Sequence, residues 1–113
     1  MKTRVRLALA QINTTVGDIA GNCRKISQNI SEAIRLGADI VSFPEAAVTG
    51  YSPDDILYDR SFVSENILAL KKIAASCGDI VAVVGFIDRK GGKLYNAAAV
   101  IRNGRVQIGR AHV

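Results

Sequence analysis

The sequence lacks tryptophan and has few residues that stiffen or cross-link a chain. Among its 113 residues there are two Pro and two Cys, and aromatic residues make up 5%. Two cysteines, Cys23 and Cys77, are too few for a disulfide framework, and their spacing fits no metal-ligand motif. With 49% hydrophobic and 22% charged residues, the composition instead favours one globular domain with an aliphatic core.

Long apolar runs are also missing. No stretch approaches the roughly 20 residues that a membrane-spanning helix needs. The apolar stretch from Leu7 to Ala10 follows basic residues but is too short for a signal peptide. We therefore expect a cytoplasmic protein that has no membrane partner.

The net charge of +5 comes without a basic cluster. A pI near 9.6 is compatible with nucleic-acid binding. However, the basic residues stand singly or in pairs, and no aromatic residues alternate with them as a base-stacking surface requires. The sequence therefore predicts no nucleic-acid partner.

Hydrophobic periodicity predicts alternating strands and helices in the first half of the chain. Period-two alternation indicates a strand over residues 4–11. Asp18 is placed to cap a helix over 19–36, whose apolar residues recur at steps of three and four. Residues 38–43 form a short apolar run, typical of a buried parallel strand, which Pro44 ends.

The second half is predicted to add a helix and an antiparallel meander. The Ser52 hydroxyl is expected to cap a short helical turn that begins at Pro53, and a longer helix is expected from Ser61 to Cys77. The remaining elements expected are a strand over 80–87, a polar loop over 88–93, a strand over 94–101, a hairpin turn at 103–104 and a strand over 106–108.

This order predicts an α/β fold: a mixed sheet with two helices on one face. Strands linked by helices are expected to be parallel, and the hairpins add antiparallel strands. Apolar strands need cover on both faces, and two helices cover only one. We expect the other face to be completed from outside these 113 residues.

Glu45 is the strongest candidate for chemistry. It follows the predicted strand over 38–43, and ligands of open α/β sheets gather at the carboxyl ends of parallel strands. It is the only charged residue between Asp39 and Asp54. Partial desolvation by its apolar neighbours is expected to strengthen Glu45 as a base. The alternative is a loop glutamate that caps a neighbouring turn.

Several segments together resemble the nitrilase (carbon–nitrogen hydrolase) superfamily, from residue 4 to about residue 110. They are Ala10-Gln11-Ile12-Asn13, Gly17-Asp18 with Gly21-Asn22, Gly37-Ala38-Asp39-Ile40-Val41, Phe43-Pro44-Glu45, Thr49-Gly50-Tyr51, Val84-Gly85-Phe86, Leu94-Tyr95-Asn96-Ala97-Ala98 and Gly104-Arg105-Val106. Within the superfamily, residues 49–57 are most similar to the glutaminase domains of the glutamine-dependent NAD+ synthetase family.

The resemblance implies that residues 1–113 are the N-terminal portion of a four-layer α-β-β-α sandwich, a partial glutaminase domain. That family uses a Glu–Lys–Cys triad on the amide of glutamine, which makes Glu45 the general base. Tyr51 is implied to line the glutamine pocket or the ammonia path. ATP and Mg²⁺ are implied only for a separate synthetase domain, with no cofactor or metal in this portion. The resemblance also implies a homo-oligomer.

The family's catalytic Lys and Cys correspond to positions after Val113. Cys23 and Cys77 fall on apolar helical stripes, where burial disfavours the thiolate, so neither is expected to replace the nucleophile. His112 is expected to be an exposed strand residue, and Lys90 and Lys93 are expected to be solvated. The chain alone is therefore predicted to be inactive.

Two alternatives stay open at this point. The first is the N-terminal part of a stand-alone amidase or carbamoylase of the same superfamily, acting on a small amide, carbamoyl or nitrile substrate. The second is a non-catalytic interaction module that completes its sheet against a partner.

Overall fold

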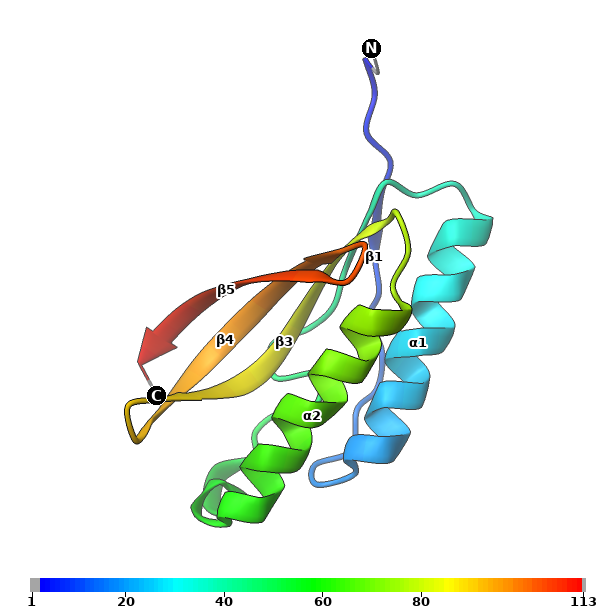
Figure 1. The fold of residues 1–113 in the computed structure, drawn as a ribbon. Helices are drawn as coiled ribbons and strands as arrows, with labels where there is room; N and C mark the ends of the chain where they lie inside the picture. Colours follow the sequence, from blue (N-terminus) through cyan, green and yellow to red (C-terminus); the bar gives the residue numbers. More distant parts are fainter. Residues whose placement is uncertain (1–2, 113) are drawn as a thin grey trace.

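A computed structural model describes residues 3–112, with the side chain of His112 outside the description. One five-stranded sheet carries two long helices on one face, as Figure 1 shows. The elements in chain order are β1 (Leu7–Leu9), α1 (Ile19–Arg35), β2 (Ile40–Ser42), the 3-10 helix η1 (Asp54–Tyr58), α2 (Arg60–Ser76), β3 (Val81–Lys90), β4 (Lys93–Arg102) and β5 (Arg105–His112).

The sheet is mixed, and its strands lie in chain order from β1 to β5. β1, β2 and β3 are parallel neighbours, whereas β3, β4 and β5 are antiparallel. Parallel neighbours need a crossover, and α1 and α2 supply the two crossovers. The predicted α/β class, the mixed sheet with parallel and then antiparallel strands, and the single helical layer are therefore confirmed.

Each helix begins at an aspartate and buries an aliphatic stripe. The Asp18 carboxylate accepts a hydrogen bond from the Gly21 amide at 3.0 Å, as predicted, which satisfies a free donor of the first turn of α1. The Asp59 carboxylate accepts from the Ser61 amide at 2.9 Å and begins α2. The buried stripes of both helices pack on the sheet in one hydrophobic core.

The polar segment after residue 87 is strand rather than the predicted loop. β3 continues to Lys90, and only Gly91 and Gly92, both at positive φ, form the turn. Charge did not prevent strand formation because the charged groups find partners. The buried Asp88 carboxylate pairs with the Arg110 guanidinium at 2.5 Å. β5 also runs well beyond the predicted 106–108, from Arg105 to His112, because it pairs with β4 along this whole length.

Other boundaries also differ from the predictions, and the second strand spans Ile40–Ser42 rather than residues 38–43. The first strand spans only Leu7–Leu9, because only these residues pair with β2. Ser52 does not cap the helical turn; its hydroxyl donates to the Asp54 carboxylate at 2.8 Å instead, and η1 begins after Pro53 without a side-chain cap. The Ser52 hydroxyl is therefore not bonded to a backbone amide of the first turn of η1.

The face of the sheet opposite the helices is uncovered within the described residues. Alternation along the strands places Leu7, Leu9 and Val100 on this face, and their side chains are exposed. By contrast, Ala8, Val41 and Ala99 point to the helices and contribute to the core or pack against it. The prediction that the helices cover only one face is confirmed. We call the uncovered side the open face.

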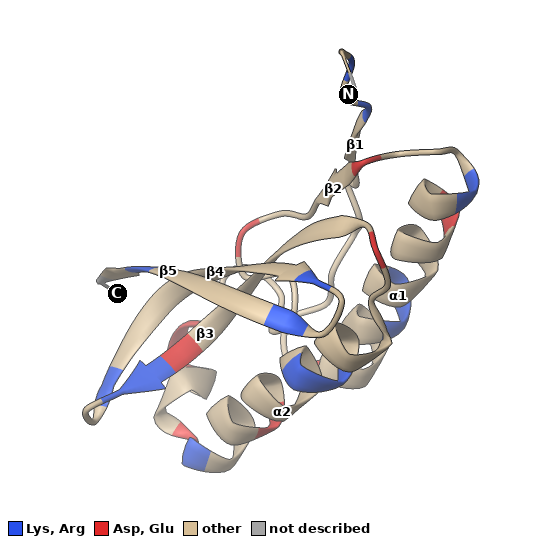
Figure 2. Ribbon diagram, turned by 45° about the horizontal axis from the view of Figure 1, so that its top comes forward, with Lys and Arg blue, Asp and Glu red and all other residues tan. Residues whose placement is uncertain are grey.

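Positive charge is spread over the molecule. Figure 2 shows Lys and Arg on both helices and at the strand ends rather than in one stripe. Within the described residues, no helix is long and apolar enough to cross a membrane. The spread of Lys and Arg agrees with the absence of a basic cluster in the sequence.

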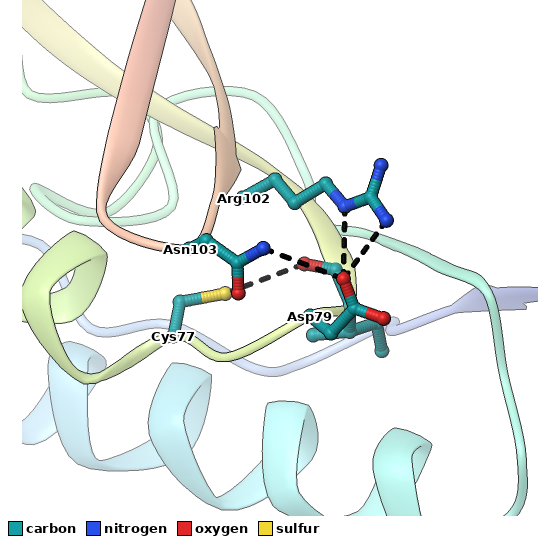
Figure 3. Close-up of polar contacts among 5 residues, drawn as sticks. Cys77, Asp79, Arg102 and Asn103 are labelled. Atoms are coloured by element: carbon teal, nitrogen blue, oxygen red, sulfur yellow. Dashed lines mark hydrogen bonds and ion pairs between the residues drawn. The ribbon is translucent and has the colours of Figure 1, made fainter.

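A polar cluster closes the end of the sheet that lies away from Glu45. The Asp79 carboxylate accepts hydrogen bonds from the Arg102 guanidinium at 2.8 Å and from the Asn103 amide at 3.4 Å (Figure 3). The Asn103 backbone amide donates to the Gly78 carbonyl at 2.9 Å. The cluster thereby ties the β4–β5 turn to the segment that enters β3.

Asp79 gives this contact a pH dependence. Hydrogen bonding and the charge of Arg102 lower the pKa of Asp79 from its ordinary value of 3.8. A lowered folded-state pKa means that the contact stabilises the fold above about pH 4 and that this contribution is lost as pH falls through the lower value. We expect Asp79→Asn to destabilise the chain slightly at pH 7, since the pair is exposed.

The measurement is urea denaturation of the two chains at pH 7 and at pH 2.5. The difference in unfolding free energy is expected to shrink at the lower pH. A difference of the same size at both pH values would show that the charge of Asp79 does not stabilise the fold.

Candidate functional site

Glu45 lies in the loop that follows β2, at the carboxyl end of the parallel strands. β2 ends at Ser42, two residues before Pro44, and Ala46 adopts a positive φ of 50°, which turns the chain directly after Glu45. The predicted position is confirmed. The predicted desolvation is wrong, because the Glu45 side chain is exposed beside the open face.

The Glu45 loop lies directly on β3 at Gly85. A Cβ atom at Gly85 would come within 2.6 Å of the Ala46 nitrogen and 2.7 Å of the Pro44 carbonyl oxygen. Real Cβ atoms do not approach backbone so closely, so only glycine fits here. Because Gly85 has no side chain, the loop that carries Glu45 can pack directly against β3.

Beyond the end of β2, no described strand pairs with this edge of β3. Groups of the Glu45 loop and of α2 bond the backbone of β3 there instead. The Phe43 amide donates to the Val83 carbonyl at 2.9 Å, and the Val48 amide to the Gly85 carbonyl at 3.1 Å. The buried Asn66 of α2 then binds both backbone groups of Ile87, accepting from its amide at 3.1 Å and donating to its carbonyl. The Glu45 loop is thereby fixed at both of its ends.

A second buried asparagine holds the loop from the helix side. The Asn22 side chain of α1 is fully buried and donates to the carbonyls of Val48 and Thr15 at 3.1 and 2.9 Å. Its side-chain oxygen accepts from the Thr15 amide at 2.8 Å. Asn22 therefore joins α1, the segment after β1 and the Glu45 loop.

Asn96 of β4 reaches Glu45 from the neighbouring strand. Its side-chain amide donates a hydrogen bond to Oε1 of Glu45. The two residues are 51 positions apart in the chain, and the β3–β4 register brings them together by placing Asn96 opposite Ile87. The structure therefore identifies Asn96 as a hydrogen-bond partner of the Glu45 carboxylate.

Glu45 and Asn96 line a cavity of about 230 Å³ between the Glu45 loop and η1. Tyr51 also lines it, with 66% of its surface exposed, as do Ile87 and Leu57. The two predicted site residues, Glu45 and Tyr51, therefore share one cavity. No Lys or Arg belongs to its described lining.

Glu45 and Asn96 also border a second hollow, of about 540 Å³, on the open face. Gly85 and Gly109 form part of its floor. The carboxylate is thus accessible both from the small cavity and from the side where the sheet lacks cover. A further layer on the open face would meet Glu45 directly.

Neither cysteine takes part in this site. Cys77 is buried at the end of α2, where its thiol lies 3.6 Å from the Ile80 carbonyl oxygen, and Cys23 is half-buried on α1. Burial raises the pKa of both thiols, which disfavours the reactive thiolate. The predicted core position is confirmed for Cys77, whereas Cys23 is half-buried and packs against the core. Among residues 3–112, no group of three or more His, Cys, Asp or Glu is placed to hold a metal ion.

Three residues that build the site were not assigned a role from the sequence. Asn96 and Gly85 lie within segments that carry the family resemblance, and Asn22 follows the predicted helix cap. Their roles depend on contacts over 26 to 51 positions for the two asparagines, which local patterns do not reveal. Only the family resemblance singled out these segments.

The arrangement is an accessible carboxylate, hydrogen-bonded by a neutral amide and fixed by its loop, and such a carboxylate can accept a proton. Comparison with known proteins then shows the family. The carbon–nitrogen hydrolase family matches residues 6–112, nearly the whole chain. The chain belongs to the carbon–nitrogen hydrolase family.

Relatives of this carbon–nitrogen hydrolase chain include the glutamine-dependent NAD(+) synthetases of Xanthomonas campestris, 42% identical over 104 residues, and Thermotoga maritima, 38% identical over 105 residues. Each match covers 91% of this chain but only 19% and 18% of the relative. The chain therefore spans about a fifth of the length of the curated relatives it matches.

Solved structures show the same fold. The glutamine-dependent NAD(+) synthetase of Cytophaga hutchinsonii superimposes with a TM-score of 0.90 at 30% identity, covering 96% of this chain and 19% of that one. A nitrilase-superfamily amidase of Nesterenkonia superimposes with a TM-score of 0.82 at 25% identity, covering 94% and 42%. The predicted nitrilase-type fold is confirmed.

Proposed function

We propose that this chain supplies the general-base half of a glutamine amidohydrolase site, as part of the glutaminase domain of a glutamine-dependent NAD+ synthetase. The observation that carries the proposal is Glu45, held on a glycine-floored loop at the carboxyl end of the parallel strands. Relatives named glutamine-dependent NAD(+) synthetase, at up to 42% identity, support the choice of substrate.

In the proposed reaction, the Glu45 carboxylate accepts the proton of a cysteine thiol as the sulfur attacks the side-chain amide carbon of glutamine. A lysine stabilises the oxyanion that forms, and protonated Glu45 returns the proton to the amide nitrogen as the C–N bond breaks and ammonia leaves. Water then hydrolyses the thioester and releases glutamate. In this proposal the cysteine and the lysine come from outside this chain, since no described Lys lines either space beside Glu45 and burial disfavours the thiolates of Cys23 and Cys77. Tyr51 lines the glutamine pocket.

Under this proposal, the released ammonia serves the ATP-dependent amidation of nicotinic acid adenine dinucleotide in a separate synthetase domain. In this proposal ATP and Mg²⁺ belong to that other domain, as the family resemblance implies. A cytoplasmic location and a homo-oligomeric assembly are part of the proposal.

The proposal is tested by fusing the chain to the X. campestris enzyme in place of that enzyme's matching segment. We expect the fusion to release ammonia from glutamine and the 113-residue chain alone to release none. Glutamine hydrolysis by the isolated chain, or a folded fusion without glutaminase activity, would contradict the proposal.

The second candidate function is that of a stand-alone amidase, favoured by the similarity to the Nesterenkonia enzyme. The two candidates differ in substrate. Small aliphatic amides assayed beside glutamine separate them, because a glutaminase pocket is expected to prefer the amino-acid amide. A preference of the fusion for the small amides would favour the amidase.

A further inference from the structure

We propose that Asn96 is a positioning residue that holds the Glu45 carboxylate in its reactive orientation. The inference rests on the proposed function, because it assumes that Glu45 is the base. Its own basis is the hydrogen bond from the Asn96 side-chain amide to Oε1 of Glu45.

The two partners differ in how firmly the fold holds them. Asn96 lies within β4, which pairs with strands on both sides: Asn96 is opposite Ile87 of β3 and Ala111 of β5. Glu45 lies in a loop, and its side chain is exposed. A long, exposed glutamate samples several rotamers unless a fixed group holds it. Asn96 provides that fixed group.

The chemistry of an amide suits this role. An amide N–H donates a hydrogen bond without carrying a charge, so it orients a carboxylate and leaves its negative charge uncompensated. A Lys or Arg at the same place would form an ion pair and weaken the carboxylate as a base. One oxygen, Oε1, is engaged by Asn96, and the second remains for the proton that the reaction transfers.

The surroundings place this pair where a substrate binds. Glu45 and Asn96 line both the 230 Å³ cavity and the hollow on the open face. The hydrogen bond therefore lies between the two spaces rather than in the core. A group at this point affects the reacting carboxylate directly, which distinguishes Asn96 from the buried Asn22 and Asn66.

The test compares Asn96→Ala, Asn96→Gln and Asn29→Ala in the fusion described above. A misplaced base costs turnover rather than binding, so we expect Asn96→Ala to lower kcat about 10- to 100-fold with little change in KM. Asn96→Gln keeps an amide donor and is expected to recover part of kcat. Asn29 bonds a carbonyl within α1, away from the site, so Asn29→Ala is the matched control.

An unchanged kcat in Asn96→Ala, or a rise in KM alone, would overturn the inference. Either result would show that Asn96 does not affect the proton transfer to Glu45. Loss of folding is detected by circular dichroism of each variant. If Asn96→Ala does not fold, the comparison of Asn96→Gln with Asn29→Ala decides in its place: a kcat below that of the control supports positioning.

A measurement on the 113-residue chain separates this inference from the proposed function. Side-chain amide resonances of asparagine are resolved by NMR with ¹⁵N labelling. Glu45→Ala is expected to shift the Asn96 amide resonances and to leave those of Asn29 in place. An inactive unsubstituted fusion would count against the proposed function, whereas an Asn96 resonance that ignores Glu45→Ala would overturn the inference.

Discussion

Glu45→Gln in the fused enzyme is expected to lower kcat for glutamine hydrolysis by about 10²- to 10⁴-fold, the usual contribution of a general base. The substitution keeps the size of the side chain and an oxygen that can accept from Asn96. It removes only the ability to take a proton. KM is expected to change little, because binding does not need that proton transfer.

Added ammonium salt provides the control. Under the proposed function, ammonia made by the glutaminase site can be replaced from solution, so NAD+ synthesis from ammonium is expected to survive Glu45→Gln. A variant that loses both activities has lost its fold or assembly. A variant that retains glutaminase turnover within a few-fold of the unsubstituted fusion would show that Glu45 is not the base.

Gly85→Ala is expected to cost about 1–3 kcal/mol of unfolding free energy in the 113-residue chain, the range for overpacked sites. The new methyl group would meet backbone of the Glu45 loop at 2.6 and 2.7 Å. Backbone cannot rotate away as a side chain can, so the loop must lift from β3. We expect the Asn96 side-chain resonances to shift as well, because Glu45 moves with its loop.

Gly109→Ala is the matched control for this prediction. Gly109 lies on the same face and in the same row of the sheet as Gly85, with Ala98 between them. A Cβ at Gly109 would meet nothing within 4 Å. Its substitution is therefore expected to leave the stability and the Asn96 resonances nearly unchanged. Equal losses for Gly85→Ala and Gly109→Ala would show that the close approach to the loop is not what requires glycine.

Periodicity predicted most of the architecture, because local patterns report on local structure. The helical stripes, the Asp18 cap and the order of parallel and antiparallel strands follow from residue spacing. The predictions failed where contacts between residues far apart in the chain determine the secondary structure. Asp88 resembles loop material in isolation, but its backbone lies opposite Tyr95 of β4 and its carboxylate pairs with Arg110, 22 positions away.

The candidate site divides in the same way. Glu45 could be found from its position after an apolar run and before a turn, and family resemblance gave it a role. The contact of Asn96 with Glu45 could not be predicted, since the two residues are 51 positions apart in the chain. The exposure of Glu45 was also unpredictable from its apolar sequence neighbours, because Phe43 and Ala47 are buried in the core while Glu45 is exposed beside the open face.

The occupied edge of β3 also bears on self-association. A strand whose backbone groups are free invites a strand from another molecule, which leads to edge-to-edge aggregation. Beside the Glu45 loop this route is closed, because Val83, Gly85 and Ile87 already bond the loop and Asn66. The outer strands of the described sheet are β1 and β5, and β1 offers just three residues for strand addition. Any intermolecular β-pairing should therefore begin at β5.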